Sequence, residues 1–371
     1  MFASPSSRRI LPAFLVILIF FAACGDDDDP GTPPAPPLWQ EVDLGATPPS
    51  QMWAVDFHGD QGLALGLDVP WKKSPDVAAS HYFFNLQPDG NWEKADPVEV
   101  PAGAFLFDLA YDGSGKVSLA GAQTSPISSL VIDARGADPV VINNSGLGLL
   151  TVDGEGSFMV AGGRSRGGDL WTSTDPGTWN VDNLPLTGTN DSGFRDVYIR
   201  GDKAVACGYD DGADTLQVIL ERTTSTEWTK VPTGGPYTGT YFCIALGEDG
   251  TIFVGGIEGA GGMSPKAFLS RRSTTGLWAE LLLPEPEALH GVNDILIASD
   301  GSIYLACMGE GENSMANLVH AFPGGVRTEI TPFPGGLLQL GEATNGDIYA
   351  VGFRRNEQDG TETGVMLVKS P

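Results

Sequence analysis

Basic residues are scarce in this sequence. Its 371 residues include 21 lysines and arginines but 47 aspartates and glutamates, which gives a formal net charge of −26. A protein with such an excess of negative charge is repelled by the phosphate backbone of nucleic acids. We therefore expect no nucleic acid among its partners.

Cysteine is also rare, with four in the whole chain. Cys24 lies near the N-terminus, whereas Cys207, Cys243 and Cys307 each lie in an apolar run. An exported scaffold held together by disulfides carries a denser and even set of cysteines. We interpret these last three as small, buried hydrophobic side chains.

Signatures of catalysis and metal binding are missing as well. The four histidines show no HExxH spacing, and no phosphate-binding loop occurs. The acidic stretch 209–215 lacks the alternating ligands and distal glutamate of a calcium loop, so we interpret it as a solvated turn. We expect no metal and no cofactor, and we assign no catalytic residue. A two-carboxylate glycosidase stays open, because the many acidic residues form no distinctive pair.

Long hydrophobic runs are limited to one, from Ile10 to Ala23, which follows Arg8 and Arg9 and precedes Cys24. Its 14 residues are too few to span a bilayer, which needs about 20. The pattern predicts a signal peptide over residues 1–23. The sequence FFAAC at 20–24 resembles the bacterial lipobox, which implies lipidation of Cys24 and a membrane anchor. An ordinary secretory signal cleaved near Ala23 is the alternative.

Four consecutive aspartates and several prolines follow Cys24, and they predict an extended, solvated tether over residues 24–37. In lipoproteins of bacteria with two membranes, an aspartate directly after the cysteine favours the inner membrane. Gly25 holds that position here. The resemblance therefore implies an outer-membrane lipoprotein of the cell envelope.

One short phrase recurs seven times in the remaining residues, 38–371. It consists of a glycine-rich turn, a small apolar strand and a final glycine or cysteine, and it occupies residues 58–66, 112–121, 153–162, 200–208, 248–256, 299–307 and 345–352. The six intervals from Gly66 to Gly352 average about 48 residues. An apolar strand precedes each turn, and Asp-Gly or Asn-Gly at most of the turns is typical of tight β-hairpins.

Four antiparallel strands repeated at this interval predict an all-β fold, a seven-bladed β-propeller. The seventh repeat ends at Pro371 after only three strands. The stretch LWQEVDL at 38–44 has the pattern of the missing fourth strand, with Trp39 in the place of Trp92, Trp179, Trp228 and Trp278. We therefore expect the N-terminal strand to pair with the last blade and close the ring.

The stretch WTSTDPGTW at 171–179 resembles the Asp-box of the sialidase-like (BNR) propellers through Ser173, Asp175, Gly177 and Trp179. The resemblance implies a structural role in the turn between the third and fourth strands of a blade. In that role the Asp175 side chain accepts hydrogen bonds from backbone N–H groups of the turn, and Trp179 packs between blades. Kelch propellers are the second family considered, from the Gly-Gly pairs at 162–163 and 255–256, but the kelch Tyr-to-Trp spacing is missing.

A sialidase also needs an arginine triad, a tyrosine nucleophile and an R-I-P motif, and the sequence has no such motif. We therefore expect a membrane-tethered, non-catalytic, monomeric propeller that binds a protein or glycan. Variable loops on a rigid frame commonly carry function. The loops between second and third strands, and between blades, share one face and hold the candidate binding residues Trp71, Lys72, Lys73, Arg164, Arg166, Arg354 and Arg355. An exported glycan-active hydrolase or lyase of sialidase-like fold is the alternative.

Overall fold

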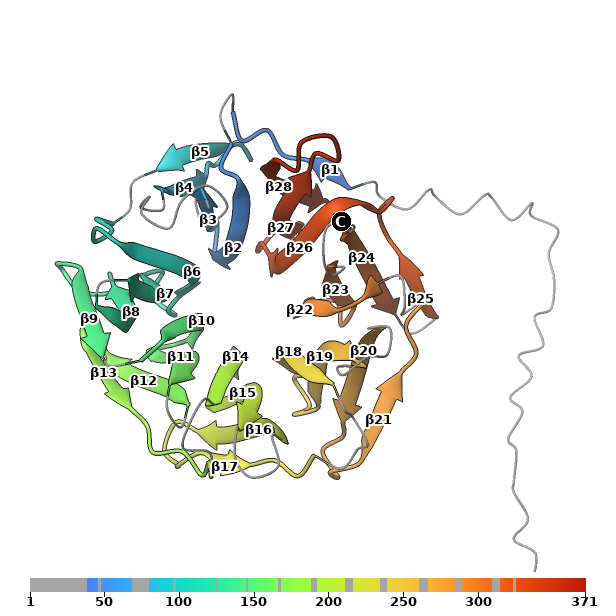
Figure 1. Cartoon of the computed structure of the whole chain (residues 1–371). Coiled ribbons are helices and arrows are strands. Elements are labelled where there is room, and N and C mark those ends of the chain that lie inside the picture. The colour runs from blue at the N-terminus through green and yellow to red at the C-terminus, as the bar shows by residue number, and fades with distance from the viewer. Residues whose placement is uncertain are drawn as a thin grey trace, which may run out of the picture. The chain divides into compact units, whose positions relative to one another are not determined.

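Antiparallel hairpins account for most of the described chain (Figure 1). The structure is a computed structural model. It describes residues 39–45, 48–68, 80–95, 98–124, 126–144, 146–165, 168–187, 192–210, 216–233, 239–259, 266–284, 289–308, 314–322 and 325–371. No helix within these ranges is long and apolar enough to cross a membrane.

The strands form seven blades arranged as a ring, which confirms the propeller fold (Figure 1). Blade 1 comprises β2 (Gln51–His58), β3 (Gln61–Asp68), β4 (Ser80–Leu86) and β5 (Trp92–Ala95). Blade 2 comprises β6 (Ala104–Tyr111), β7 (Val117–Thr124), β8 (Ile127–Asp133) and β9 (Val140–Asn144). Blade 3 comprises β10 (Gly148–Glu155), β11 (Phe158–Ser165), β12 (Asp169–Asp175) and β13 (Thr178–Val181). Blade 4 comprises β14 (Ser192–Arg200), β15 (Lys203–Asp210), β16 (Leu216–Thr223) and β17 (Thr229–Lys230). Blade 5 comprises β18 (Thr240–Leu246), β19 (Ile252–Glu258), β20 (Lys266–Arg272) and β21 (Trp278–Leu281). Blade 6 comprises β22 (Val292–Ile297), β23 (Ile303–Met308), β24 (Met315–Phe322) and β25 (Gly325–Thr328). Blade 7 comprises β26 (Phe333–Glu342), β27 (Ile348–Arg355), β28 (Glu362–Lys369) and β1 (Gln40–Glu41).

The first strand of each blade lines the centre of the ring, and the fourth lies at the rim (Figure 1). Short pairings between neighbouring blades join blade 3 to blade 4 and blade 6 to blade 7. The hydrophobic core lies between blades. In one cluster, for example, Leu63 and Phe83 of blade 1 pack with Leu106 and Leu119 of blade 2.

The N-terminal strand closes the ring as the sequence predicts. Gln40 pairs with Val368 and Glu41 with Leu367, and the Val42 N–H donates to the Met366 carbonyl at 2.9 Å. β1 thus provides the fourth strand of blade 7, although only two of its residues pair in regular register.

A charged cluster lies beside this closure. The indole N–H of Trp39 donates to Glu329 Oε2 at 3.4 Å, and Lys369 Nζ lies 3.2 Å from the same oxygen. The other oxygen, Oε1, accepts from Arg327 at 2.6 Å and lies 3.0 Å from His320 Nδ1. Burial alone would raise the pKa of Glu329, but these partners lower it to about 2. The carboxylate therefore stays charged and links the N-terminal strand to blades 6 and 7.

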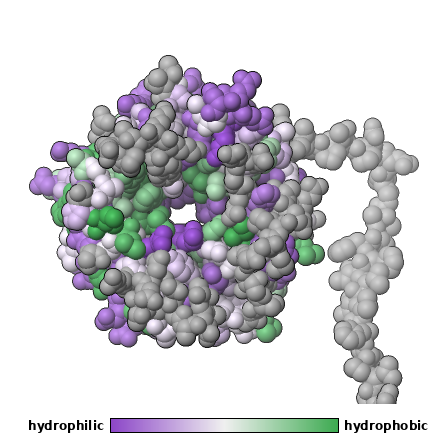
Figure 2. Space-filling view, viewed as in Figure 1, coloured by the Kyte–Doolittle hydropathy of each residue, from purple (hydrophilic) through white to green (hydrophobic). Residues whose placement is uncertain are grey.

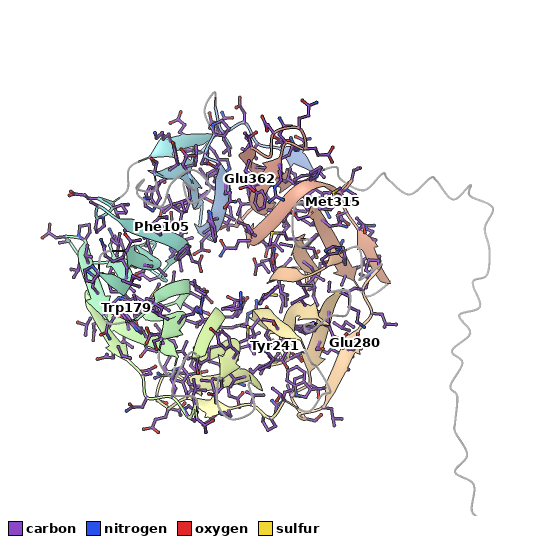
Figure 3. All side chains as sticks on the ribbon, in the orientation of Figure 1. Phe105, Trp179, Tyr241, Glu280, Met315 and Glu362 are labelled. Atoms are coloured by element: carbon purple, nitrogen blue, oxygen red, sulfur yellow. The ribbon has the colours of Figure 1, made fainter. Side chains whose placement is uncertain are left out.

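Rim tryptophans link other blades in the same way. Three of them donate the indole N–H to an acceptor 46 residues upstream in the preceding blade: Trp179 to Asp133, Trp228 to Asp182 and Trp278 to the Pro232 carbonyl. Figure 3 shows Trp179 on the outer part of its blade. The equal spacing shows that the tryptophan is part of the repeat itself.

The Asp-box turn has the expected place but a different hydrogen-bond acceptor. It joins β12 to β13, between the third and fourth strands of blade 3. Asp175, however, is exposed, and the hydrogen bond its carboxylate accepts comes from the neighbouring Thr174 hydroxyl at 3.5 Å. Asp133 of the preceding blade accepts from both the Gly177 N–H and the Trp179 indole at 2.9 Å. The role expected for Asp175 is therefore corrected: Asp133, fixed by the buried Arg135, holds this turn.

Candidate functional site

A β-bulge occurs in the first strand of every blade. In each of the seven, the register shifts by one residue against the second strand. A bulge leaves one residue outside the ladder and changes the direction of its side chain. The seven bulged residues are Trp53, Phe107, Leu150, Arg195, Phe242, Asn293 and Leu338, and all of them line one cavity of about 350 Å³. We call these seven residues the collar.

Glycine opposite the bulge makes this arrangement possible. A Cβ atom on Gly121 would lie 2.1 Å from the Phe105 carbonyl oxygen, and one on Gly208 would lie 2.0 Å from the Gly193 carbonyl oxygen. Any larger residue would push the inner strand away. In four of the seven copies, at Gly121, Gly208, Gly256 and Gly352, the final glycine of the repeated phrase therefore serves the close approach of the two strands at the bulge.

The collar is mainly apolar. Trp53 and Phe107 contact each other with ring centroids 5.5 Å apart, and the Arg195 guanidinium lies 4.9 Å from the centre of the Phe242 ring. Asn293 donates to the Leu337 carbonyl at 2.8 Å. Figure 2 shows an opening at the middle of the ring, with both hydrophobic and hydrophilic residues at its edge. A cavity of this size and lining is typical of a binding site.

A second layer of polar residues lies next to the collar along the channel. Asp108, Thr151, Asp196, Asp294 and Gln339 line both the collar cavity and a second, more polar cavity of about 270 Å³. We call these five residues the waist. Each directly follows a collar residue in the sequence, so the bulges set the positions of both layers.

Channel carboxylates connect successive blades. Four of them accept the N–H of their own next residue and an N–H of the following blade: Asp56 from Tyr111, Asp108 from Val152, Asp153 from Ile199 and Asp294 from Leu340. Asp196 accepts from the Ile244 N–H at 2.7 Å and from the Thr151 hydroxyl at 3.2 Å. Gln339 accepts from Val55 of blade 1 and donates to Asp108. The contacts described for these side chains therefore support the ring itself.

Burial raises the pKa of each of these carboxyl groups, against the opposing effect of the hydrogen bonds they accept. The pKa rises to about 6 for Asp56 and Asp294, to about 7 for Asp108 and to about 8 for Asp153. For Asp196, burial and the charge of Asp294 raise the pKa well above its ordinary value. The channel consequently changes its charge around neutral pH.

These pKa values predict that alkaline pH destabilises the fold. Between the ordinary carboxyl pKa of 3.8 and the raised values, the folded chain holds protons that the unfolded chain has released. The free energy of unfolding therefore falls as pH rises, by at most about 1.4 kcal/mol per pH unit for each group. We expect calorimetry to show a melting temperature that declines from about pH 5 to pH 8.5.

The Asp153→Asn variant should flatten this decline, because it removes a carboxyl group whose pKa is raised to about 8. Asp89→Asn is the matched control, because Asp89 is fully exposed and its pKa is lowered by hydrogen bonds with Asn91. A melting temperature of the unmodified chain that stays constant or rises from about pH 5 to pH 8.5 would contradict the raised pKa values of the channel carboxyl groups.

The sequence-predicted binding residues lie partly outside the described residues, namely Trp71, Lys72, Lys73 and Arg166. Arg164, Arg354 and Arg355 end strands β11 and β27 rather than lying in loops. Arg354 pairs with Glu41 at 2.8 Å and Arg355 with Glu362 at 2.9 Å. These strand ends lie beside the starts of the inner strands, on the same face as the collar.

No group of three metal-ligating side chains occurs in the ranges that the structure describes. The three described cysteines, Cys207, Cys243 and Cys307, are free and buried, and burial raises the pKa of each thiol. They are therefore poor nucleophiles at neutral pH. This agrees with their interpretation as small hydrophobic side chains.

Comparisons with known proteins support the fold. No protein family profile matches the sequence, and no curated protein resembles it. Among solved structures, the chain is similar to "YCF48 bound to D1 peptide", at 13% identity and a TM-score of 0.57, covering 91% of this chain and 97% of the other. It is also similar to the WD40 β-propeller domain of Doa1, at 13% identity and a TM-score of 0.58, covering 90% and 98%. At this identity, the likeness establishes that the chain has a β-propeller fold.

Proposed function

We propose that this protein is a non-catalytic propeller that binds a segment of a partner protein at the collar. The observation that carries the proposal is the cavity of about 350 Å³ lined by all seven bulged residues. Seven equivalent bulges place mainly apolar side chains around one opening, where they are half-buried rather than packed in the core. The solved propeller whose title names a bound peptide is consistent with a protein partner.

A glycan-active enzyme is the alternative that the sequence leaves open. Catalysis by two carboxylates needs an acid and a base that can reach the substrate. The channel carboxylates instead accept hydrogen bonds from groups that join neighbouring blades. These contacts favour a supporting role for the acidic residues and a binding role for the collar.

The proposal includes a lipid anchor at Cys24, which lies outside the described residues. Such an anchor would hold the propeller at the outer membrane through the proline-rich segment. Glycan remains the second class of partner that the sequence predicts, through Trp71, Lys72 and Lys73, which lie outside the described residues.

Site-specific photocrosslinking in the host cell tests the proposal. A benzophenone amino acid at Leu338, in the collar, should give a discrete adduct with a partner protein. The same probe at Leu277 is the matched control, because this leucine is 72% exposed in the β20–β21 turn on the opposite face. Adducts of equal yield at both positions, or at Leu277 alone, would place the binding surface elsewhere.

In the same cells, Cys24→Ala should move the protein from the membrane fraction to the soluble fraction, and an unchanged distribution would refute the anchor.

A further inference from the structure

Arg195 is the one cation among the seven collar residues. Among the described residues, no ion pair joins Arg195 to a carboxylate, whereas Arg222, Arg327 and Arg355 each pair with one. Arg195 is exposed at the channel mouth and stacks on the Phe242 ring. Its guanidinium therefore has hydrogen-bond donors that face the cavity or solvent.

Arg164, a sequence-predicted binding residue, lies close to Arg195. It pairs with Gly193 in the contact between blades 3 and 4, two residues before Arg195. A Cβ atom on Gly193 would lie 2.7 Å from Arg164 Cγ and 3.3 Å from Tyr209 Cε1, so the glycine leaves room for both side chains. Although Arg195 is exposed, its partial removal from water lowers its pKa, and the positive charge of Arg164 has a smaller effect in the same direction.

The rest of the collar determines which kind of side chain we expect next to a bound carboxylate. Trp53 and Phe107 lie in contact, and Leu150 and Leu338 add aliphatic surface around the same cavity. The waist carboxylates already accept hydrogen bonds from neighbouring N–H and O–H groups. Donors on Arg195 thus remain available in the cavity, beside a surface that favours aromatic or branched side chains.

We propose that the collar recognises a carboxylate next to an aromatic or branched apolar side chain in the partner protein, with the carboxylate at Arg195. The apolar side chain then packs against Trp53, Phe107 and Phe242. Arginine binds carboxylates through a planar fork of two parallel N–H donors, which a lysine cannot reproduce. This inference rests on the proposed binding function and adds the chemistry of the bound segment.

Titration calorimetry with short probes tests the inference on the folded, full-length chain. The probes are N-acetyl-Ala-Phe as the free acid, the same dipeptide as its amide, and N-acetyl-Glu-Phe-amide, which carries its carboxylate on a side chain. We expect at least one of the two carboxylate probes to bind tenfold or more tightly than the dipeptide amide. The free acid alone would identify a chain terminus as the source of the carboxylate, and N-acetyl-Glu-Phe-amide alone would identify an internal acidic residue.

Variants connect this preference to Arg195. Arg195→Gln should abolish the difference between acid and amide, and Arg195→Lys should retain only part of it. Arg271→Gln is the matched control, because Arg271 is an exposed arginine on a strand of blade 5. Melting curves of all variants check that the fold is intact.

Equal binding of the carboxylate probes and the amide, or a preference that persists in Arg195→Gln, would overturn the inference. If the photocrosslink at Leu338 still formed in that case, the proposed function would stand without it. If neither the crosslink nor probe binding occurred, both would fail.

Discussion

Deleting residues 39–44 should lower the free energy of unfolding by about 3–5 kcal/mol, the range typical of removing a buried tryptophan alone. The deletion removes the pairing of β1 with β28 and exposes an unpaired strand edge in blade 7. It also removes the edge-to-face contact of Trp39 with Tyr304, at 6.3 Å between ring centroids, and one donor to Glu329. Val42 and Leu44 leave the core cluster between blades 7 and 1.

Denaturant unfolding followed by circular dichroism measures this effect. Gln40→Ser is the matched control, because Gln40 is exposed and a serine keeps the backbone pairing with Val368. The substitution should shift stability by no more than about 0.5 kcal/mol. A deletion variant that unfolds at the same denaturant concentration as the full chain would mean that β1 does not hold the ring closed.

The sequence predicts this architecture because the propeller repeats its local chemistry. A glycine-containing turn, apolar strands and a nearly constant interval recur in each blade, and each hairpin forms where the phrase predicts it. The closing strand is predictable for the same reason, since Trp39 stands where other blades have a rim tryptophan. Each copy of the local pattern is a weak indication alone, but its seven occurrences together predict the fold.

The collar was not predicted, because a bulge changes which side chains face the channel. Strict alternation along a strand assigns residues to two faces, and one extra residue reverses that assignment beyond it. A signal was nevertheless present. The repeated phrase ends on glycine in six copies and on Cys307 in the seventh, and this position lies at or beside the bulge. Aspartates within apolar strands, such as Asp108 and Asp196, also marked the channel.

The Asp-box shows why contacts between blades are harder to predict than a local motif. The motif correctly predicts the turn, but the acceptor of its hydrogen bonds lies 44 residues upstream of Gly177, in another blade. Asp133 and Arg135 are two residues apart in an unremarkable stretch of sequence. Nothing in their spacing indicates that they meet Ser173 and Trp179 in the folded chain.

Asp133→Ala should be among the most destabilising single substitutions, at about 3–5 kcal/mol. The Asp133 carboxylate is fully buried and lies 2.7 Å from Arg135 Nη2, with side-chain exposures of 0% and 1%. Burial alone would raise the pKa of Asp133, but hydrogen bonds from Arg135, Gly177 and Trp179 lower it below its ordinary value. Removing the carboxylate leaves a buried guanidinium without its counter-charge and three further N–H donors, on the Arg135 backbone, the Gly177 backbone and the Trp179 indole, without an acceptor.

Asp175→Ala is the matched comparison, since it removes a carboxylate from the same turn. Asp175 is exposed, and its carboxylate accepts only a long hydrogen bond from Thr174 among the described contacts, so the loss should be no more than about 0.5 kcal/mol. Asp133→Asn should fall between the two, because the amide oxygen can still accept one hydrogen bond while the counter-charge to Arg135 is lost. Equilibrium unfolding of the three variants gives the order directly. If Asp175→Ala destabilised the chain as much as Asp133→Ala, the Asp-box carboxylate would hold the turn after all, and the link between blades 2 and 3 would be secondary.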